Sequence, residues 1–386
     1  MTVGTELSGG GEQVHLTFLR DLHHGGRQNQ PTQMAGRLAR FVGRARRSVH
    51  IAIYDFRLDA PELAGPVVTA LREAADRGVQ VRIAYDRGKP VLHQSTEAFA
   101  AAGADPAPVG TDAWLRAHFA GSAVELRPIG APSGKLMHDK YVVRDAHTPA
   151  AAVWTGSANF TDAAWSRQEN NVLEIASPGL AAAYEIDFSE LWQSGDIVST
   201  GVDDQGTVRV GDARVRYAFG PGEGASIDGG LATLVHGARR DVAVASMVLT
   251  SHTILGALID ALDRGVRVWG IYDRGQMDPI VKQWEQSQHG AASAAAFRAV
   301  ASHLVGKRSA PYTPDGPHDF MHDKLLVVDG RFVATGSHNL SRNATGNAEN
   351  SLVLRSERVA SAFRQHVREV VAAYARRLDE AALLSA

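Results

Sequence analysis

The side chains best suited to chemistry occur in two matching sets. Each set has a histidine, a lysine two residues later and an aspartate five residues after the lysine: His138, Lys140 and Asp145, then His322, Lys324 and Asp329. An imidazole can attack phosphorus or transfer a proton, and an ammonium group can neutralise the oxygens of an anion. One set is half of a site, and two sets in one chain predict a complete site for chemistry on a phosphate ester.

A Gly-Ser-x-Asn stretch follows each set and adds a hydroxyl and an amide. Residues two apart in a strand face the same side, so each histidine shares a face with its lysine, and each serine with its asparagine. We expect Asn159 and Asn339 to bind phosphate oxygens, whereas Ser157 and Ser337 either do the same or shape a turn. The aspartate of each set has the opposite parity, near the end of its strand, and is expected to be a structural anchor or a charge partner.

The repeat extends far beyond these motifs. The stretch from Asp76 to Gly88 is identical to that from Asp263 to Gly275 at nine of thirteen positions. The offset between the copies is 187 residues there, 184 at the histidines and 180 at the Gly-Ser-x-Asn stretches. A slowly drifting offset indicates one duplicated unit with small changes in its loops.

Each copy alternates strands with helices. Helices are expected at 62–77, 180–193, 253–264 and 358–378, with Gly78 and Gly265 as C-cap glycines. Strands are expected around them, at 47–55, 141–143, 152–155 and 171–175 in the first copy, and at 241–249, 325–328, 332–335 and 351–354 in the second. The pattern predicts an α/β fold of two similar lobes, each a mixed sheet flanked by helices, related by a pseudo-twofold axis.

The lobes are expected at 12–200 and 207–386, joined by the Gly/Asp-rich stretch 194–206. The formal charge of −2 shows no basic excess of the kind that non-specific nucleic-acid binders carry, and the absence of cysteine excludes thiolate chemistry. The first residues do not form a signal peptide, and no apolar run approaches the roughly 18 residues of a membrane span. A cytoplasmic location is therefore expected, although a mature secreted protein would show the same features.

These residues resemble those of the phospholipase D superfamily, whose hallmark is His-x-Lys-x4-Asp followed by Gly-Ser-x-Asn. The second copy fits fully, whereas the first has a longer gap before Gly156, which indicates a longer hairpin. The Glu-Asn pair of the family occurs twelve residues after each serine, at Glu169-Asn170 and Glu349-Asn350. The resemblance covers about 45–193 and 237–378.

The resemblance implies a site at the interface of the two lobes. One histidine attacks phosphorus and forms a phosphohistidine, and the other protonates the leaving oxygen and then activates water or an alcohol. It implies His138 as the nucleophile and His322 as the acid and base, although near-symmetry leaves the reverse assignment open. Glu169 and Glu349 would each accept the far ring N–H of a histidine. The resemblance implies no metal or cofactor, and internal pairing makes a monomer sufficient.

Several functions remain open. A phospholipase D that cleaves or exchanges a head group is narrowly favoured, because the charge is near neutral and the inserts 87–135 and 274–320 carry apolar and aromatic residues that could face lipid. A nuclease would need a local basic stripe to draw DNA or RNA. Its candidates are Arg87, Lys135, Arg167, Arg274, Lys307, Arg308 and Arg342. A non-catalytic phosphate-binding module is disfavoured, because both histidines and both lysines are present. Small-molecule phosphodiesters also remain open.

Overall fold

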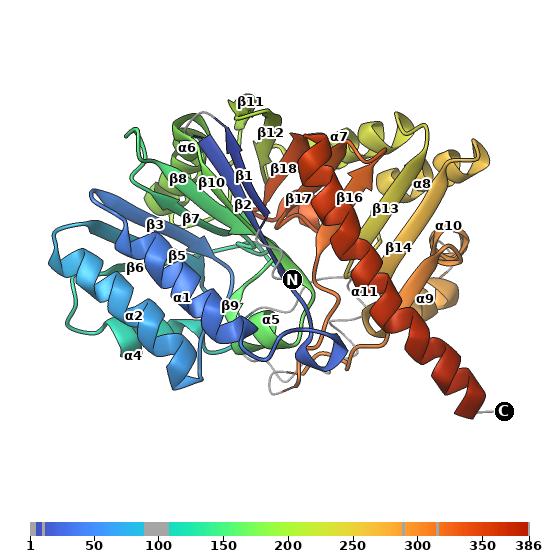
Figure 1. Cartoon of the computed structure of the whole chain (residues 1–386), viewed down its shortest axis with the longest axis horizontal. Coiled ribbons are helices and arrows are strands. Elements are labelled where there is room, and N and C mark those ends of the chain that lie inside the picture. Colours follow the sequence, from blue (N-terminus) through green and yellow to red (C-terminus); the bar gives the residue numbers. More distant parts are fainter. Residues whose placement is uncertain (1–4, 10–11, 89–107, 288–289, 314–315, 385–386) are drawn as a thin grey trace.

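The structure is a computed structural model of the 386-residue chain. It describes residues 5–9, 12–88, 108–287, 290–313 and 316–384. Figure 1 shows the N-terminal half on the left and the C-terminal half on the right, with one sheet in each.

The two sheets have the same strand order. The first runs β1-β2-β10-β8-β7-β3-β5-β6, and the second β11-β12-β18-β17-β16-β13-β14-β15. The strands of the first are β1 (Thr5–Gly9), β2 (Glu12–Leu19), β3 (Ser48–Ile53), β5 (Gln80–Asp86), β6 (Glu125–Ile129), β7 (Lys140–Arg144), β8 (Ala152–Gly156) and β10 (Asn170–Ala176). Those of the second are β11 (Gln205–Val210), β12 (Ala213–Phe219), β13 (Asp241–Ser246), β14 (Arg267–Asp273), β15 (Leu304–Lys307), β16 (Lys324–Val328), β17 (Phe332–Gly336) and β18 (Asn350–Arg355). A short parallel pair, β4 (Phe56–Arg57) and β9 (Phe160–Thr161), lies apart from both.

Helices cover both faces of each sheet. Buried side chains place α1 (Gln30–Gly43), α2 (Pro61–Asp76), α4 (Thr111–Phe119) and α5 (Asp162–Ser166) on the outer face of the first sheet. They place α7 (Gly224–His236), α8 (His252–Asp263), α9 (Arg274–Gln286) and α10 (Ala291–Ala301) on the outer face of the second. Short 3-10 turns, η1 (Leu22–His24) and η2 (Ala344–Gly346), complete the connections.

The inner faces of the two sheets share one core. Helices α6 (Pro178–Ser194) and α11 (Glu357–Leu384) contribute Tyr184, Phe188 and Phe363 to a cluster that also contains strand residues of both sheets. A continuous apolar core packs at high density and resists relative movement. The packing therefore fixes one lobe against the other, as a site shared between them requires.

The α/β fold of two similar lobes predicted from the sequence is confirmed. The expected C-cap residues Gly78 and Gly265 follow α2 and α8 with φ of 83° and 78°. The sequence did not predict the edge strands β6 and β15, because both are short and lie within the polar inserts. Part of the first insert, 89–107, lies outside the described residues. Among the described residues, no helix has both the length and the hydropathy needed to cross a lipid bilayer.

Candidate active site

His138 and His322 lie at the interface of the lobes. Each precedes by two residues the lysine that begins β7 or β16, and each is tied to the opposite lobe by its backbone. The N–H of His138 donates to the carbonyl oxygen of Ala348 at 2.8 Å, and that of His322 to the carbonyl oxygen of Glu169 at 3.1 Å. Both side chains line one cavity of about 60 Å³. The lobes therefore bring the two imidazoles to one space.

A carboxylate of the second lobe holds His138. Nδ1 of the ring lies 3.0 and 2.9 Å from the two carboxyl oxygens of Glu349, and both side chains are fully buried. This is the hydrogen bond that the resemblance implied for Glu349. Such a contact fixes the tautomer and the orientation of an imidazole, so that chemistry at the ring falls to Nε2.

His322 is held differently. Its Nδ1 lies 3.0 Å from the amide oxygen of Asn170 and 3.1 Å from the carbonyl oxygen of Ser157. The bond implied between this ring and the carboxylate of Glu169 is absent; that carboxylate accepts hydrogen bonds from Lys307 Nζ at 2.6 Å and from the Tyr374 hydroxyl at 2.5 Å. The two histidines therefore have chemically different partners.

A difference in strand register explains why His322 contacts Asn170, whereas His138 contacts Glu349. Gly156 in β8 pairs with Val172 in β10, whereas Gly336 in β17 pairs with Ser351 in β18. The loop before β10 is thus one residue longer, and Asn170 takes the place of Glu349. The equal spacing of the two Glu-Asn pairs was misleading, because strand pairing, not the dipeptide, sets which side chain faces the histidine.

The serines support these partners. Ser157 Oγ donates to the amide oxygen of Asn170 at 2.7 Å and accepts from the N–H of Asn171 at 3.0 Å. Ser337 Oγ accepts from the N–H of Asn350 at 2.9 Å. Both serines are fully buried. Both hydroxyls are hydrogen-bonded within the chain, where they hold the start of the last strand of each lobe.

The two lysines and the two asparagines lie beside the histidines. Lys140 Nζ and Lys324 Nζ each donate, at 2.7 Å, to the carbonyl oxygen of the histidine of their own motif. Both ammonium groups are buried and contribute to lowering the pKa of both histidines. Asn159 lines the cavity, and its buried amide oxygen has no hydrogen bond among the described residues. Asn339 is buried at the equivalent place.

The last aspartate of each motif anchors a turn. The carboxylate of Asp145 accepts from the backbone N–H groups of residues 46–48, at 2.6 to 3.1 Å. The carboxylate of Asp329 does the same for residues 239–241. Both residues have positive φ, 54° and 53°. These contacts hold the far end of each motif strand against the start of β3 or β13.

The aspartates inside the motifs point away from the cavity. Asp323 accepts from Asn171 Nδ2 at 2.7 Å and pairs with His366 Nε2 at 2.8 Å. Asp139 accepts from Asn350 Nδ2 at 3.1 Å, and burial raises its pKa to about 7. Each asparagine thus crosses to the other lobe. These two contacts were not predicted from the sequence, although Asn171 and Asn350 lie at the start of the last strand of their lobe.

The first lobe has an aspartate where the second has His366. Asp187 in α6 accepts from the Tyr141 hydroxyl at 2.5 Å, and burial together with the charge of Asp139 raises its pKa well above its usual value. One oxygen of Asp139 and one of Asp187 are buried without a hydrogen bond among the described residues. The protonated form of this carboxyl pair is therefore favoured in the fold.

Burial controls the charge of the catalytic candidates. It is the largest cause that lowers the pKa of His138 and of His322 well below 6.5, and the buried lysines add to it. Burial also raises the pKa of Glu349 well above its usual value. Both rings are therefore neutral at pH 7 until an anion enters the cavity.

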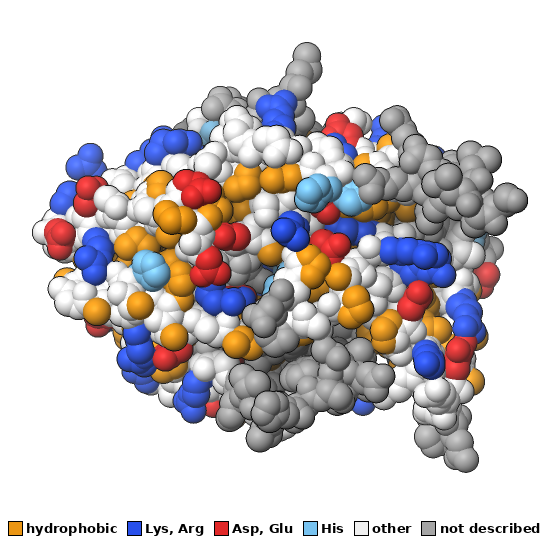
Figure 2. All heavy atoms as spheres, turned by 90° about the horizontal axis from the view of Figure 1, so that it is seen from below, with side chains coloured by type: hydrophobic (Ala, Val, Ile, Leu, Met, Phe, Trp, Pro, Cys, Tyr) orange, Lys and Arg blue, Asp and Glu red, His pale blue; other side chains and the backbone are white. Residues whose placement is uncertain are grey.

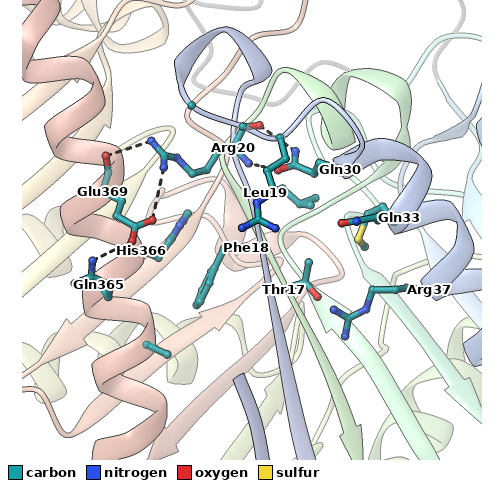
Figure 3. A pocket seen from close by; sticks show the side chains of 15 residues that line it. Thr17, Phe18, Leu19, Arg20, Gln30, Gln33, Arg37, Gln365, His366 and Glu369 are labelled. Carbon is teal, nitrogen blue, oxygen red and sulfur yellow. Dashed lines mark hydrogen bonds and ion pairs between the residues drawn. The ribbon is translucent and has the colours of Figure 1, made fainter. Parts of the chain in front are cut away.

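A larger pocket of about 160 Å³ lies apart from the histidines, between β2, α1 and α11 (Figure 3). Two of the guanidinium groups on its walls form ion pairs within the chain, Arg20 with Glu369 at 3.6 Å and Arg37 with Glu174 at 2.6 Å. His366, the partner of the second motif's inner aspartate, also lines it. The pocket contains no catalytic candidate.

Comparison with solved structures finds a similar fold in a lipid synthase and weaker, partial likenesses to two other proteins. Phosphatidylserine synthase of Haemophilus influenzae Rd KW20 matches with a TM-score of 0.60 and 13% identity, over 92% of this chain and 85% of that one. Nuc of Salmonella typhimurium, described as a phospholipase D family member, is 24% identical over 41% of this chain and 93% of its own, with a TM-score of 0.31. NucT of Helicobacter pylori is 18% identical over 42% of this chain and 98% of its own, with a TM-score of 0.34.

The sequence matches a family model in two segments, one in each lobe. No curated protein is matched by the sequence as a whole. The model described as cardiolipin synthase, PLD-like domain, matches residues 38–192 and 231–371, which include both histidine motifs and most of the chain. The chain belongs to the family of phospholipase D-like domains, in a duplicated form.

Proposed function

We propose that this chain cleaves or transfers a phosphodiester through a phosphohistidine, with a phospholipid as substrate. The observation that carries the proposal is that His138 and His322, from different lobes, line one cavity and are each held through Nδ1. Two imidazoles so arranged can act on opposite sides of one phosphorus.

The steps follow from the two Nδ1 contacts. Nε2 of His138 forms a bond to phosphorus, the bond from phosphorus to the leaving oxygen breaks, and His322 gives its proton to that oxygen. His322 then takes a proton from water or an alcohol, whose oxygen bonds phosphorus as the bond to Nε2 breaks. Lys140 and Lys324, with Asn159 and Asn339, supply donors for the non-bridging oxygens.

The unequal partners support this assignment. An imidazole bonded to phosphorus is cationic and keeps its Nδ1 proton, so a carboxylate such as Glu349 stabilises the adduct. A general acid must release its proton, and the neutral acceptors Asn170 and Ser157 do not retain charge on His322. Glu349 therefore favours His138 as the nucleophile.

The lining of the cavity supports a lipid rather than a polyanion. Among the described residues it includes Tyr54, Met247, Tyr312 and Phe320, and no lysine or arginine. Of the basic residues that a nuclease could use, Lys307 is buried in an ion pair with Glu169. On the face seen in Figure 2, the described lysines and arginines are scattered among acidic and hydrophobic side chains. A nucleic acid bound here would meet few cationic side chains, so the release of its counterions would contribute little to affinity.

One observation favours the nuclease alternative. Burial, and after it the charge of Arg342, lower the pKa of Lys135, whose Nζ donates to the amide oxygen of Asn343 at 3.0 Å. Two neighbouring cations at the lobe interface could hold a second phosphate of a nucleic-acid strand.

A side-by-side assay decides between these substrates. Purified protein is incubated with phosphatidylcholine and phosphatidylglycerol vesicles, single-stranded DNA and double-stranded DNA, with and without EDTA. We expect release of head groups that EDTA does not reduce. Cleavage of DNA but not of phospholipid would support a nuclease instead of a phospholipase. Strict dependence on a divalent ion would contradict the metal-independent mechanism.

A further inference from the structure

His318 occupies a backbone position that the first lobe fills with glycine. It lies four residues before His322, just as Gly134 lies four residues before His138. Both are left-handed, with φ of 46° at His318 and 75° at Gly134. Glycine adopts this conformation without cost, whereas a histidine there is strained. The duplication thus supplies an internal comparison, in which the second lobe carries a side chain at an unfavourable place.

The ring of His318 is held in a stack of aromatic side chains. It lies between Tyr312, at 4.9 Å and 9°, and Phe320, at 5.7 Å and 22°. Its Nε2 donates to the carbonyl oxygen of Thr313 at 2.6 Å, so Nδ1 carries the lone pair of the neutral ring. Gln168 Nε2 donates to the His318 carbonyl oxygen at 2.9 Å and holds the strained backbone.

This stack borders the cavity of the catalytic histidines. Tyr312, His318 and Phe320 all line that cavity together with His138 and His322. The equivalent positions in the first lobe offer no such wall, since Gly134 has no side chain and Leu136 is aliphatic. The first lobe contributes Tyr54 to the lining, so the two sides are unequal in that the stack of three rings belongs to the side of the His322 motif.

We propose that His318 is a specificity-determining residue, which forms with Tyr312 and Phe320 one wall of a subsite for the alcohol part of the diester. The inference rests on the proposed phosphodiesterase function and adds the class of alcohol. Nδ1 of His318 accepts a hydrogen bond from a hydroxyl, and the aromatic side chains pack against carbon-bound hydrogens of the same group.

The charges of the lining select an uncharged alcohol. Asp55 is the one carboxylate among the described lining residues, and Arg57 holds both of its oxygens at 3.0 and 3.1 Å. A cationic head group would therefore find no unpaired carboxylate in the described lining, and a head group with a second anionic charge would find no lysine or arginine there. A neutral, hydroxyl-bearing alcohol such as glycerol leaves no buried charge without a partner.

The test compares two histidines that both have positive φ. His318→Gly removes the wall and the strain together. His147→Gly removes the same kind of strain at an exposed hairpin residue with φ of 64°, away from the cavity. The substrates are monomeric dihexanoyl phosphatidylglycerol, phosphatidylcholine and phosphatidylserine, with bis(4-nitrophenyl) phosphate as a generic diester. Release of each alcohol and thermal unfolding are measured for the wild type and both variants.

We expect the wild type to prefer phosphatidylglycerol. His318→Gly should lower kcat/KM for this lipid about tenfold, so that the three lipids have similar values of kcat/KM. Neither variant should lower the melting temperature, and His147→Gly should retain the wild-type ranking. The inference is overturned if the wild type treats the three lipids alike, or if His318→Gly keeps the ranking. In both cases, the proposed phosphodiesterase function is still supported if the wild type turns over the generic diester. If the wild type turns over none of the diesters, both that function and this inference are contradicted.

Discussion

His138 and Glu349 are 211 residues apart in the chain, yet Nδ1 of the one lies 2.9 Å from Oε2 of the other, with both side chains fully buried. The contact crosses the interface of two duplicated lobes, and its counterpart at His322 uses an amide and a carbonyl oxygen instead. The site is therefore symmetric in its histidines and lysines but asymmetric in what orients the histidines.

Glu349→Gln should lower kcat by roughly 10² to 10⁴-fold, because the amide cannot stabilise a cationic imidazole and can select the wrong tautomer. The measurement is steady-state turnover of an aryl phosphodiester, with circular dichroism to verify folding. A well-folded variant with nearly wild-type kcat would contradict the role given to this carboxylate.

Asn170→Ala is the matched change at the other histidine. It removes one acceptor from His322 Nδ1, but the carbonyl oxygen of Ser157 remains. The expected loss in kcat is about fivefold, as for one hydrogen bond of about 1 kcal/mol. A larger loss than in Glu349→Gln would reverse the order of importance of the two partners.

The pH dependence follows from the lowered pKa of both histidines. Activity needs one neutral ring and one protonated ring, and kcat/KM reports the free enzyme. Its alkaline limb should therefore lie below pH 6.5. The limb of kcat should lie at higher pH, since a bound phosphodiester anion favours the imidazolium. Rate profiles between pH 4 and 9 measure both, and coincident limbs above pH 7 would refute the expectation.

Lys307→Met should destabilise the fold, because it leaves the buried carboxylate of Glu169 without the ammonium group at 2.6 Å. The expected loss in free energy of unfolding is about 3–5 kcal/mol. Urea unfolding measures it. Adding Glu169→Gln should recover much of the loss, since it removes the charge that lay nearest to the lost ammonium group; a double variant as unstable as the single one would show that packing, not charge, is responsible.

Asp187→Asn should make stability less dependent on pH. A carboxyl group with a raised pKa in the fold stabilises the fold in its protonated form. For Asp139 this contribution is complete below the ordinary value of 3.8 and is lost as pH rises to about 7. Removing the neighbouring acid should flatten that decline and raise the melting temperature at pH 8. An unchanged slope between pH 4 and 7 would show that the pair is not protonated in the fold.

The fold and the histidine motifs could be predicted because each rests on a repeated pattern. Strand and helix periods occur twice, and so do the histidine, lysine and aspartate spacings. The role of Glu169 could not be predicted, because the one-residue difference in register before β10 is decided by strand pairing across the sheet. The contacts of Lys307 and Asn171 were also inaccessible, since their partners come from the other lobe.

His318 illustrates a further limit. Its spacing before His322 is visible in the sequence, but its left-handed backbone and its aromatic neighbours are known only from the structure. Comparison with Gly134 in the duplicate lobe was the signal that could have identified it, because glycine at one copy suggests a conformation that histidine adopts at a cost.

Mass spectrometry of the covalent adduct tests the central claim most directly. His322→Ala, mixed with an aryl phosphodiester and quenched in alkali, should accumulate a phosphoryl group on His138, because nitrophenolate leaves without an acid while the second step lacks its base. His138→Ala should give no adduct. A phosphoryl group on His322 in His138→Ala, with none on His138 in the reciprocal variant, would contradict the account.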